Sequence, residues 1–180
     1  MSIPYTRQNI TQEDLAAVLG SLRNDLITRG TMTDALEHDL CNLMDAKYAV
    51  CFSSGTAALI AALFAVHERA GTASITTTTN TFSAIANAAH TFGRTLDLCD
   101  ISLVDYLGYY EYESNVPPKL FVPMDFAGYP TDSFYNVPMI IRDACHSLPS
   151  WIGRRPLDTS WMTVFSFHPT KHIAAGEGGA

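Results

Sequence analysis

The chain has 180 residues, of which 47% are hydrophobic and 16% are charged, so it is long enough to bury a core and is neither disordered nor fibrous. Its formal net charge of −7, with no basic run, argues against nucleic acid as a partner. The charged fraction is below the roughly 25% usual for soluble domains, so we expect an oligomer in which a partner covers part of the surface.

No segment of the sequence indicates export or membrane insertion. The longest apolar stretches, such as residues 57–66, are much shorter than the about 20 residues that cross a bilayer, and residues 1–8 lack the apolar core of a signal peptide. We therefore expect a cytoplasmic protein with no membrane partner. The four cysteines are scattered without a CxxC pair, which favours reduced thiols over a disulfide framework or a zinc site. They are Cys41, Cys51, Cys99 and Cys145.

Apolar periodicity and turn residues predict helices that alternate with short strands. Thr11, with two acidic residues soon after it, is a helix N-cap pattern, and Gly93 stands where a helix is expected to end. The predicted helices cover residues 11–23, 33–46, 57–69 and 82–92. The predicted strands cover residues 48–52, 74–78, 95–99, 120–124, 139–141 and 161–166.

Strands that alternate with helices indicate an α/β fold, a largely parallel sheet with helices on both faces. The connection between residues 125 and 139 has room for a tight loop but is short for a crossover helix. In such sheets a ligand binds outside the carboxyl ends of the strands. Polar residues gather at these ends, in residues 53–56, 80–82, 125–129, 143–146 and 166–171.

Residues 53–56 place small side chains and free backbone N–H groups at the start of a helix. A helix start favours a phosphate, because its N–H groups lack acceptors and the helix dipole is positive there. The same residues also suit an ordinary N-cap. The chain contains no GxxxxGK[ST] motif, so ATP and GTP are not expected as ligands.

Asp143 follows an apolar strand and should lie at a poorly hydrated strand end, where a bare carboxylate is too costly. It is either a turn cap or the counter-ion of a cationic ligand nitrogen. His146, three residues later, either packs on the same ligand or caps the next turn.

Lys171 follows the segment FSFHPT and precedes the glycine-rich GEGG. A lysine so placed, with His168 and His172 nearby, is desolvated and deprotonated more easily than a surface lysine. A neutral lysine is a nucleophile that forms imines with carbonyl groups. The alternative is an ordinary surface lysine. The two histidines do not indicate a metal site, because Pro169 opposes a helix between them and no third ligand stands at a suitable spacing.

A phosphate cradle, an acid and a lysine at three strand ends match the three fixed points of pyridoxal phosphate (PLP). These points are its phosphate, its pyridinium nitrogen and its aldehyde carbon. Phe82 would either stack on the cofactor ring or belong to the core, and Ser166 would offer a hydroxyl to the phosphate.

Several segments together resemble the DegT/DnrJ/EryC1/StrS family of sugar aminotransferases, which use PLP on nucleotide-linked keto-sugars. The segment FSFHPTKHIAAGEGGA is similar to the lysine motif of that family. The other segments follow in the same order along the chain, namely IPYTRQNIT, LITRGTMTDALEHDL, AKYAVCFSSGTAALIAAL, TTTTNTFSAIANAA, MDFAGYPTD and IRDACHSLP. The opening segment, DFAG and DACHSL most resemble the branch that aminates C4 of UDP-linked 4-keto-6-deoxy-N-acetyl sugars on the way to pseudaminic acid.

The resemblance implies a role for each candidate residue. Lys171 would bond covalently to the cofactor and later move a proton, and Asp143 would pair with the pyridine nitrogen. The other implied cofactor-binding residues are Phe82 on the ring, His146 beside it, and Gly55, Thr56 and Ser166 on the phosphate. The residues implied in the sugar-nucleotide pocket are Tyr5, Ile27, Thr28, Arg29 and Gly30.

The implied reaction takes an amino group from L-glutamate and places it on C4 of a nucleotide-linked 4-keto-6-deoxy sugar, for cell-surface sugar biosynthesis. Lys171 favours transamination, since a sister group with His at this position performs dehydration. The family builds each active site from two subunits, so the resemblance also implies a homodimer with shared active sites.

Chains of this family continue past the GEGG turn with further strands and a carboxyl-terminal domain. The resemblance therefore implies the amino-terminal half of a fold type I aminotransferase, with an incomplete three-layer α/β/α domain. Residues 1–30 would form an amino-terminal helix and substrate loop, and residues 31–180 the PLP-binding domain. The alternative is a truncated, inactive homologue that serves as a dimerisation or ligand-binding module.

Overall fold

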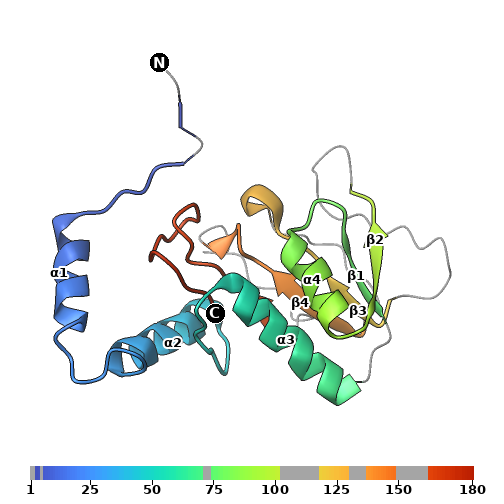
Figure 1. Cartoon of the computed structure of the whole chain (residues 1–180), viewed down its shortest axis with the longest axis horizontal. Coiled ribbons are helices and arrows are strands. Elements are labelled where there is room, and N and C mark those ends of the chain that lie inside the picture. Colours follow the sequence, from blue (N-terminus) through green and yellow to red (C-terminus); the bar gives the residue numbers. More distant parts are fainter. Residues whose placement is uncertain (1–2, 5, 71–73, 102–117, 130–136, 149–161) are drawn as a thin grey trace. The chain divides into compact units, whose positions relative to one another are not determined.

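A computed structural model describes residues 3–4, 6–70, 74–101, 118–129, 137–148 and 162–180 (Figure 1). The chain forms two compact units, residues 1–51 and residues 52–180. The functional division predicted at residue 30 stays a prediction.

The first unit contains helices α1 (Gln12–Ser21) and α2 (Thr31–Met44), whose ends differ by one or two residues from the predicted ones. Thr11 caps α1, as predicted. Its side chain accepts the backbone N–H of Asp14, and the Asp14 carboxylate accepts the backbone N–H of Thr11 at 2.7 Å, which completes a capping box.

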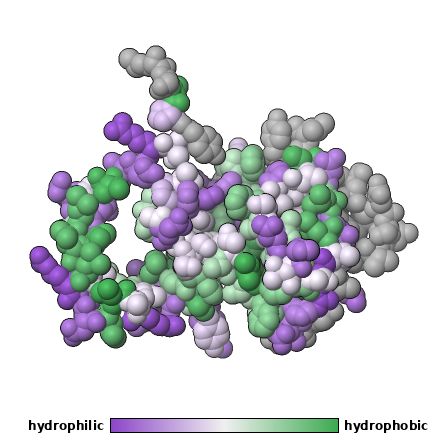
Figure 2. Space-filling model, viewed as in Figure 1, coloured by the Kyte–Doolittle hydropathy of each residue, from purple (hydrophilic) through white to green (hydrophobic). Residues whose placement is uncertain are grey.

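Helix α1 exposes apolar side chains, and Figure 2 shows apolar surface over this helix. Leu15, Val18 and Leu19 are 47%, 57% and 56% exposed, and no residue of α1 is buried. An exposed apolar stripe on a helix is typical of a surface that a partner covers. This supports the expectation of an oligomer, which stays a prediction.

The strand predicted over residues 48–52 is wrong. Within this segment the structure gives Phe52 an isolated antiparallel bridge to Gly179, and assigns the other residues to no strand. The backbone N–H of Cys51 donates to Oε1 of Glu37 at 2.8 Å, so a side chain takes the group that a neighbouring strand would need. A short apolar run forms a strand only where its backbone groups pair with a ladder.

Over the described part of the second unit, five parallel strands form one sheet in the order β2-β1-β3-β4-β5. The strands are β1 (Ser74–Thr78), β2 (Thr95–Cys99), β3 (Leu120–Val122), β4 (Met139–Asp143) and β5 (Met162–Val164). Strands β1 and β2 have the predicted bounds, and β3, β4 and β5 overlap the strands predicted over residues 120–124, 139–141 and 161–166. The parallel pairing confirms the predicted α/β fold.

Helices α3 (Gly55–Ala70) and α4 (Ser83–Thr91) pack on one face of this sheet (Figure 1). Successive strand residues point to opposite faces, so Val122 and Ile141 lie under the helices, whereas Phe121 and Ile140 belong to a separate cluster. Gly93, with φ of 60°, follows the end of α4 as predicted. Helices on the opposite face stay a prediction.

The connection from β3 to β4 contains a short 3-10 helix, η1 (Phe126–Gly128). Residues 130–136 of this connection lie outside the described residues. The prediction that it holds no full crossover helix therefore remains untested.

Candidate active site

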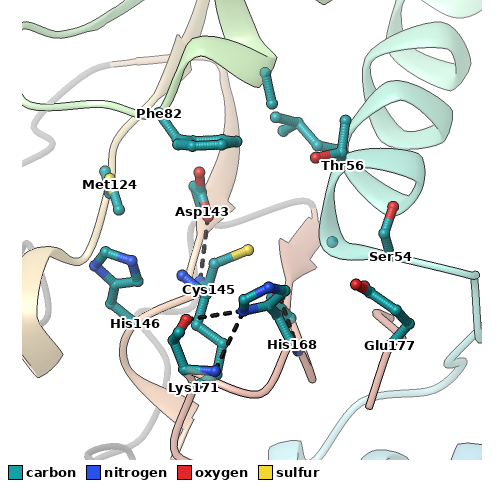
Figure 3. Close-up of a pocket in the computed structure, with 15 residues that line it drawn as sticks. Ser54, Thr56, Phe82, Met124, Asp143, Cys145, His146, His168, Lys171 and Glu177 are labelled. Atoms are coloured by element: carbon teal, nitrogen blue, oxygen red, sulfur yellow. Dashed lines mark hydrogen bonds between the residues drawn. The ribbon is translucent and has the colours of Figure 1, made fainter. Parts of the chain in front are cut away.

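A cavity of about 280 Å³ lies at the carboxyl ends of the strands in the second unit (Figure 3). Its walls come from segments that follow β1, β3, β4 and β5 and from the start of α3. The lining residues are Ser54, Gly55, Thr56, Leu59, Phe82, Ala84, Met124, Asp143, Cys145, His146, Ser166, His168, Thr170, Lys171 and Glu177. This is the place predicted for a ligand in a parallel α/β sheet.

The first turn of α3 forms one wall of the cavity. Ser54 caps the helix, because its Oγ accepts the N–H of Ala57 at 3.1 Å. A Cβ on Gly55 would lie 2.8 Å from Cβ of Ser166 and 3.0 Å from Sγ of Cys145, so a larger residue does not fit there. A helix start also carries N–H groups without an intrahelical acceptor, so the cap and the anion cradle are compatible interpretations of this segment.

Lys171 lies in a loop, residues 168–177, that backbone hydrogen bonds close at its base. The N–H of Phe167 donates to the carbonyl of Gly178 at 2.9 Å. Inside this lysine loop, the N–H of Lys171 donates to the carbonyl of His168 at 2.8 Å, and Nδ1 of His168 accepts the N–H of Thr170 at 3.2 Å. Lys171 is half-buried and lines the cavity together with His168 (Figure 3).

Gly179 joins the lysine loop to the α3 wall. It exchanges two backbone hydrogen bonds with Phe52, at 2.9 and 3.0 Å, and also bridges Ser166. A Cβ on Gly179 would lie 2.5 Å from the carbonyl oxygen of Ser54 and closer still to the nitrogen of Gly55. The two walls therefore touch at a place where only glycine fits.

Asp143 is the last residue of β4 and is 3% exposed, which confirms its predicted position at a poorly hydrated strand end. Its Oδ1 accepts the N–H of Cys145 at 3.2 Å, so it caps the following turn. The side chain also lines the cavity, as does Phe82, which stands at the N-cap of α4 (Figure 3). Capping a turn and facing a ligand are therefore compatible roles for Asp143.

Two side chains of the cavity have shifted pKa values. The pKa of His146 is lowered, first by burial and then by the charge of Lys171, while Asp143 acts in the opposite direction. Burial and the nearby Asp143 carboxylate raise the pKa of the Cys145 thiol. Both side chains are therefore kept neutral near pH 7.

The residues that the family resemblance assigns to the cofactor all line this one cavity, although they are widely separated in the sequence. They are Lys171, Asp143, His146, Phe82, Gly55, Thr56 and Ser166. The structure brings these side chains together, and their individual roles stay predictions.

The residues assigned to the sugar lie in the first unit or outside the described residues. Tyr5 is among the residues that the structure does not describe. Residues 27–30 precede α2, and Nη2 of Arg29 lies 3.6 Å from Oε2 of Glu37. Their part in a sugar site stays a prediction.

Sequence reasoning missed Met124, Cys145 and Glu177 as lining residues. Cys145 follows Asp143 by two residues at the same strand end, so its position offered a signal. Met124 is the last residue of the strand predicted over residues 120–124, and an apolar residue there carries no signal of a ligand. Glu177 stands inside the GEGG segment, whose glycines indicate only a turn.

Among the described residues, no group of three or more His, Cys, Asp or Glu side chains is placed to hold a metal ion. The four cysteines are unpaired thiols. None of the helices found in the described ranges has the length and apolar character needed to span a bilayer.

The fold and the cavity together define a class of protein, an α/β domain whose strand ends bring a lysine, a buried carboxylate and a helix start into one cavity. The chain belongs to the DegT/DnrJ/EryC1/StrS aminotransferase family, which matches residues 8–112 and 134–180. The predicted family is thereby confirmed.

Curated relatives and solved structures agree with this assignment. The UDP-4-amino-4,6-dideoxy-N-acetyl-beta-L-altrosamine transaminase of Campylobacter jejuni strain 81-176 is 31% identical, over 99% of this chain and 50% of its own length. Helicobacter pylori PseC, an aminotransferase involved in the biosynthesis of pseudoaminic acid, is 26% identical, with a TM-score of 0.79 over 98% of this chain and 50% of that chain.

Spr1654 of Streptococcus pneumoniae, in its PLP form, has the same fold, with a TM-score of 0.83 at 24% identity. The match covers 99% of this chain and 52% of that chain. The chain spans about half the length of the curated relatives it matches.

Proposed function

We propose that the cavity binds pyridoxal 5′-phosphate through Lys171 and that the protein transfers an amino group to a nucleotide-linked keto-sugar. The observation that carries this proposal is the meeting of Lys171, Asp143 and the start of α3 in one cavity. Membership of an aminotransferase family supports the reaction type.

The residues of the cavity fit this cofactor at three points. The start of α3 carries backbone N–H groups without an intrahelical acceptor and lines the cavity together with Ser166, so these N–H groups and the Ser166 hydroxyl would hold the phosphate. Asp143 is a buried carboxylate suited to a cationic ring nitrogen. Lys171 is a half-buried amine on the same cavity. The cavity volume of about 280 Å³ is near the lower end of the roughly 300–1,000 Å³ typical of ligand pockets.

When bound, PLP supplies an electron sink for the bond that breaks beside the transferred nitrogen. Asp143 holds a proton on the pyridine nitrogen, because its buried charge is stabilised by a cationic partner. Lys171 would hold the cofactor through its Nζ, and once a substrate amine has taken its place there, the same Nζ would carry the proton between the substrate and cofactor carbons. Neutral His146 would lie beside the ring and Phe82 would cover it, so that both side chains would exclude water from the reacting atoms.

For the substrates we propose L-glutamate as amino donor and a UDP-linked 4-keto-6-deoxy-N-acetyl sugar as acceptor at C4, on the way to pseudaminic acid. The names of the Campylobacter jejuni and Helicobacter pylori relatives support the acceptor. The sugar would be held by Tyr5 and residues 27–30. A cytoplasmic homodimer with shared active sites belongs to the same proposal, to which the exposed apolar stripe of α1 lends support.

The covalent step is tested by incubating the purified protein with PLP, reducing it with borohydride and mapping the labelled peptide. The chain has three lysines, and we expect the pyridoxyl label on Lys171 alone. Lys171→Ala should abolish the label. The matched control is Lys119→Ala, since this exposed lysine precedes β3 at the opposite end of the sheet and should leave labelling intact. A label on another lysine, or none, contradicts the proposal.

Amino transfer is tested separately, with glutamate and the keto-sugar nucleotide. Lys171→Ala should lower the rate by about a hundredfold or more, because it removes both the covalent anchor and the proton carrier. Labelling of Lys171 without any transfer of nitrogen would instead support the ligand-binding alternative.

A further inference from the structure

A fully buried ionic cluster lies beside the cavity and joins the end of β3 to the turn after β4. Oδ1 of Asp125 accepts a hydrogen bond from Nη1 of Arg142 at 3.0 Å, and both side chains are 0% exposed. Oδ2 of Asp125 accepts the hydroxyl of Ser147 at 3.1 Å, and Ser147 is also 0% exposed. One carboxylate therefore bonds to two points of the neighbouring segment.

The two partners of Asp125 flank the proposed cofactor residues in the sequence. Arg142 directly precedes Asp143, and Ser147 directly follows His146. The backbone adds to this arrangement, because the N–H of Asp125 donates to the carbonyl of Asp143 at 3.0 Å. Asp125 is thus bonded to segment 142–147 on either side of Asp143 and His146.

Phe126, the residue after Asp125, contacts His146 directly. The centroids of the two rings lie 6.1 Å apart, with an angle of 52° between their planes. The segment that carries Asp125 therefore fixes the histidine ring from a second direction.

A buried ion pair is an expensive way to stabilise a fold, because desolvation of the two charges offsets their attraction. Removing one member is costly, since the other charge is then left uncompensated. Asp125 and Arg142 are therefore held together, because separating them would leave two buried charges without partners. Both partners of Asp125 are next to residues 143–146 in the sequence.

We propose that Asp125 is a positioning residue that, through Arg142 and Ser147, fixes the Asp143 carboxylate and the His146 ring against the cavity. The inference rests on the proposed function, because that function gives Asp143 and His146 a cofactor to act on. It predicts that loosening the cluster changes the surroundings of His146 even when no cofactor is present.

The test is an NMR titration of the histidine side chains in the purified protein without cofactor. Ser147→Ala removes one hydrogen bond to Asp125 and leaves the Arg142 pair in place. We expect the pKa of His146, which faces Asp143, Lys171 and His172, to rise by about half a unit as the ring becomes more hydrated. Asp125→Asn is not used for this readout, because it leaves the charge of Arg142 uncompensated, and that positive charge would itself lower the pKa of His146.

The matched control is Thr77→Val in the same sheet. The hydroxyl of Thr77 is equally buried and donates to the carbonyl of Val122 at 2.6 Å. This variant should lose a comparable hydrogen bond and leave the pKa of His146 unchanged. An unchanged pKa in Ser147→Ala, or an equal shift in both variants, overturns the positioning role of Asp125.

A second readout is the affinity for PLP, measured by absorbance titration. We expect Ser147→Ala to weaken binding about tenfold and Thr77→Val to keep the wild-type affinity. A wild-type protein that binds no PLP would refute the proposed function. The histidine titration still decides the positioning role in that case, because it needs no cofactor.

Discussion

Replacing Gly179 by alanine tests whether the contact between the lysine loop and the start of α3 is as tight as the structure indicates. The added Cβ would lie 2.5 Å from the carbonyl oxygen of Ser54 and nearer still to the nitrogen of Gly55. These are backbone atoms, so no rotation of a side chain relieves the overlap. The two segments must move apart.

The cost of this movement follows from the bonds at Gly179. Separation stretches its two backbone hydrogen bonds with Phe52, now at 2.9 and 3.0 Å. Each of these hydrogen bonds stabilises the fold by about 1 kcal/mol. Forcing an extra methyl group into a closed site destabilises it by about 1 to 3 kcal/mol more. We expect the free energy of unfolding to fall by about 3 kcal/mol, and PLP binding to weaken at least about tenfold as the N–H groups of α3 leave Ser166.

Urea unfolding and PLP titration measure the two effects. The matched control is Gly20→Ala inside α1, where an added Cβ meets no atom within 4 Å. This control should keep its PLP affinity and gain about 0.5 to 1 kcal/mol, because alanine favours a helix. The reasoning is refuted if Gly179→Ala unfolds within about 0.5 kcal/mol of the wild-type protein and binds PLP equally well.

Three further predictions concern single side chains. Thr11→Ala should weaken α1 by about 1 kcal/mol, because the capping box is lost, and faster amide exchange in α1 checks this. Because the folded pKa of His146 lies below its ordinary value of 6.5, the unfolded chain binds the proton first as pH falls, so stability should drop below that pH. His146→Gln should flatten the slope of urea stability against pH in this range. Asp143→Asn keeps an acceptor for the N–H of Cys145 but removes the charge, so amino transfer should fall by about a hundredfold with the fold retained.

Local pattern was enough to predict most of the sheet. Strands β3 to β5 contain short apolar runs, and β1 and β2 are short runs rich in Thr, Ile and Leu, so the type of each element can be recognised without tertiary information. The strand expected at residues 48–52 has the same local pattern. That prediction fails because the N–H of Cys51 donates to the Glu37 carboxylate, fourteen residues earlier. The residues of the run alone do not indicate this contact.

The candidate site likewise has residues that local sequence pattern predicts and contacts that it does not. Lys171 and Asp143 stand at strand ends beside marked turn segments, so their arrival in one cavity could be predicted from the sequence. The position of Cys145 at the same strand end as Asp143 could also be predicted, but its close approach to Gly55, ninety residues earlier in the chain, could not. Asp125 was predicted at a strand end, but its bond to Arg142 depends on the register between β3 and β4.

Among the described residues two aspartates are buried, Asp125 and Asp143, and they carry their charges in different ways, which bears on which one meets a ligand. Asp125 is 0% exposed and bonds to the guanidinium of Arg142, so its charge is compensated within the protein. Asp143 is 3% exposed, bonds to a neutral backbone N–H and lines the cavity. The low polarity that makes such a charge costly also strengthens its attraction for a cation placed beside it. A protonated ring nitrogen in the cavity would therefore be held by Asp143, whereas Asp125 already has its cation.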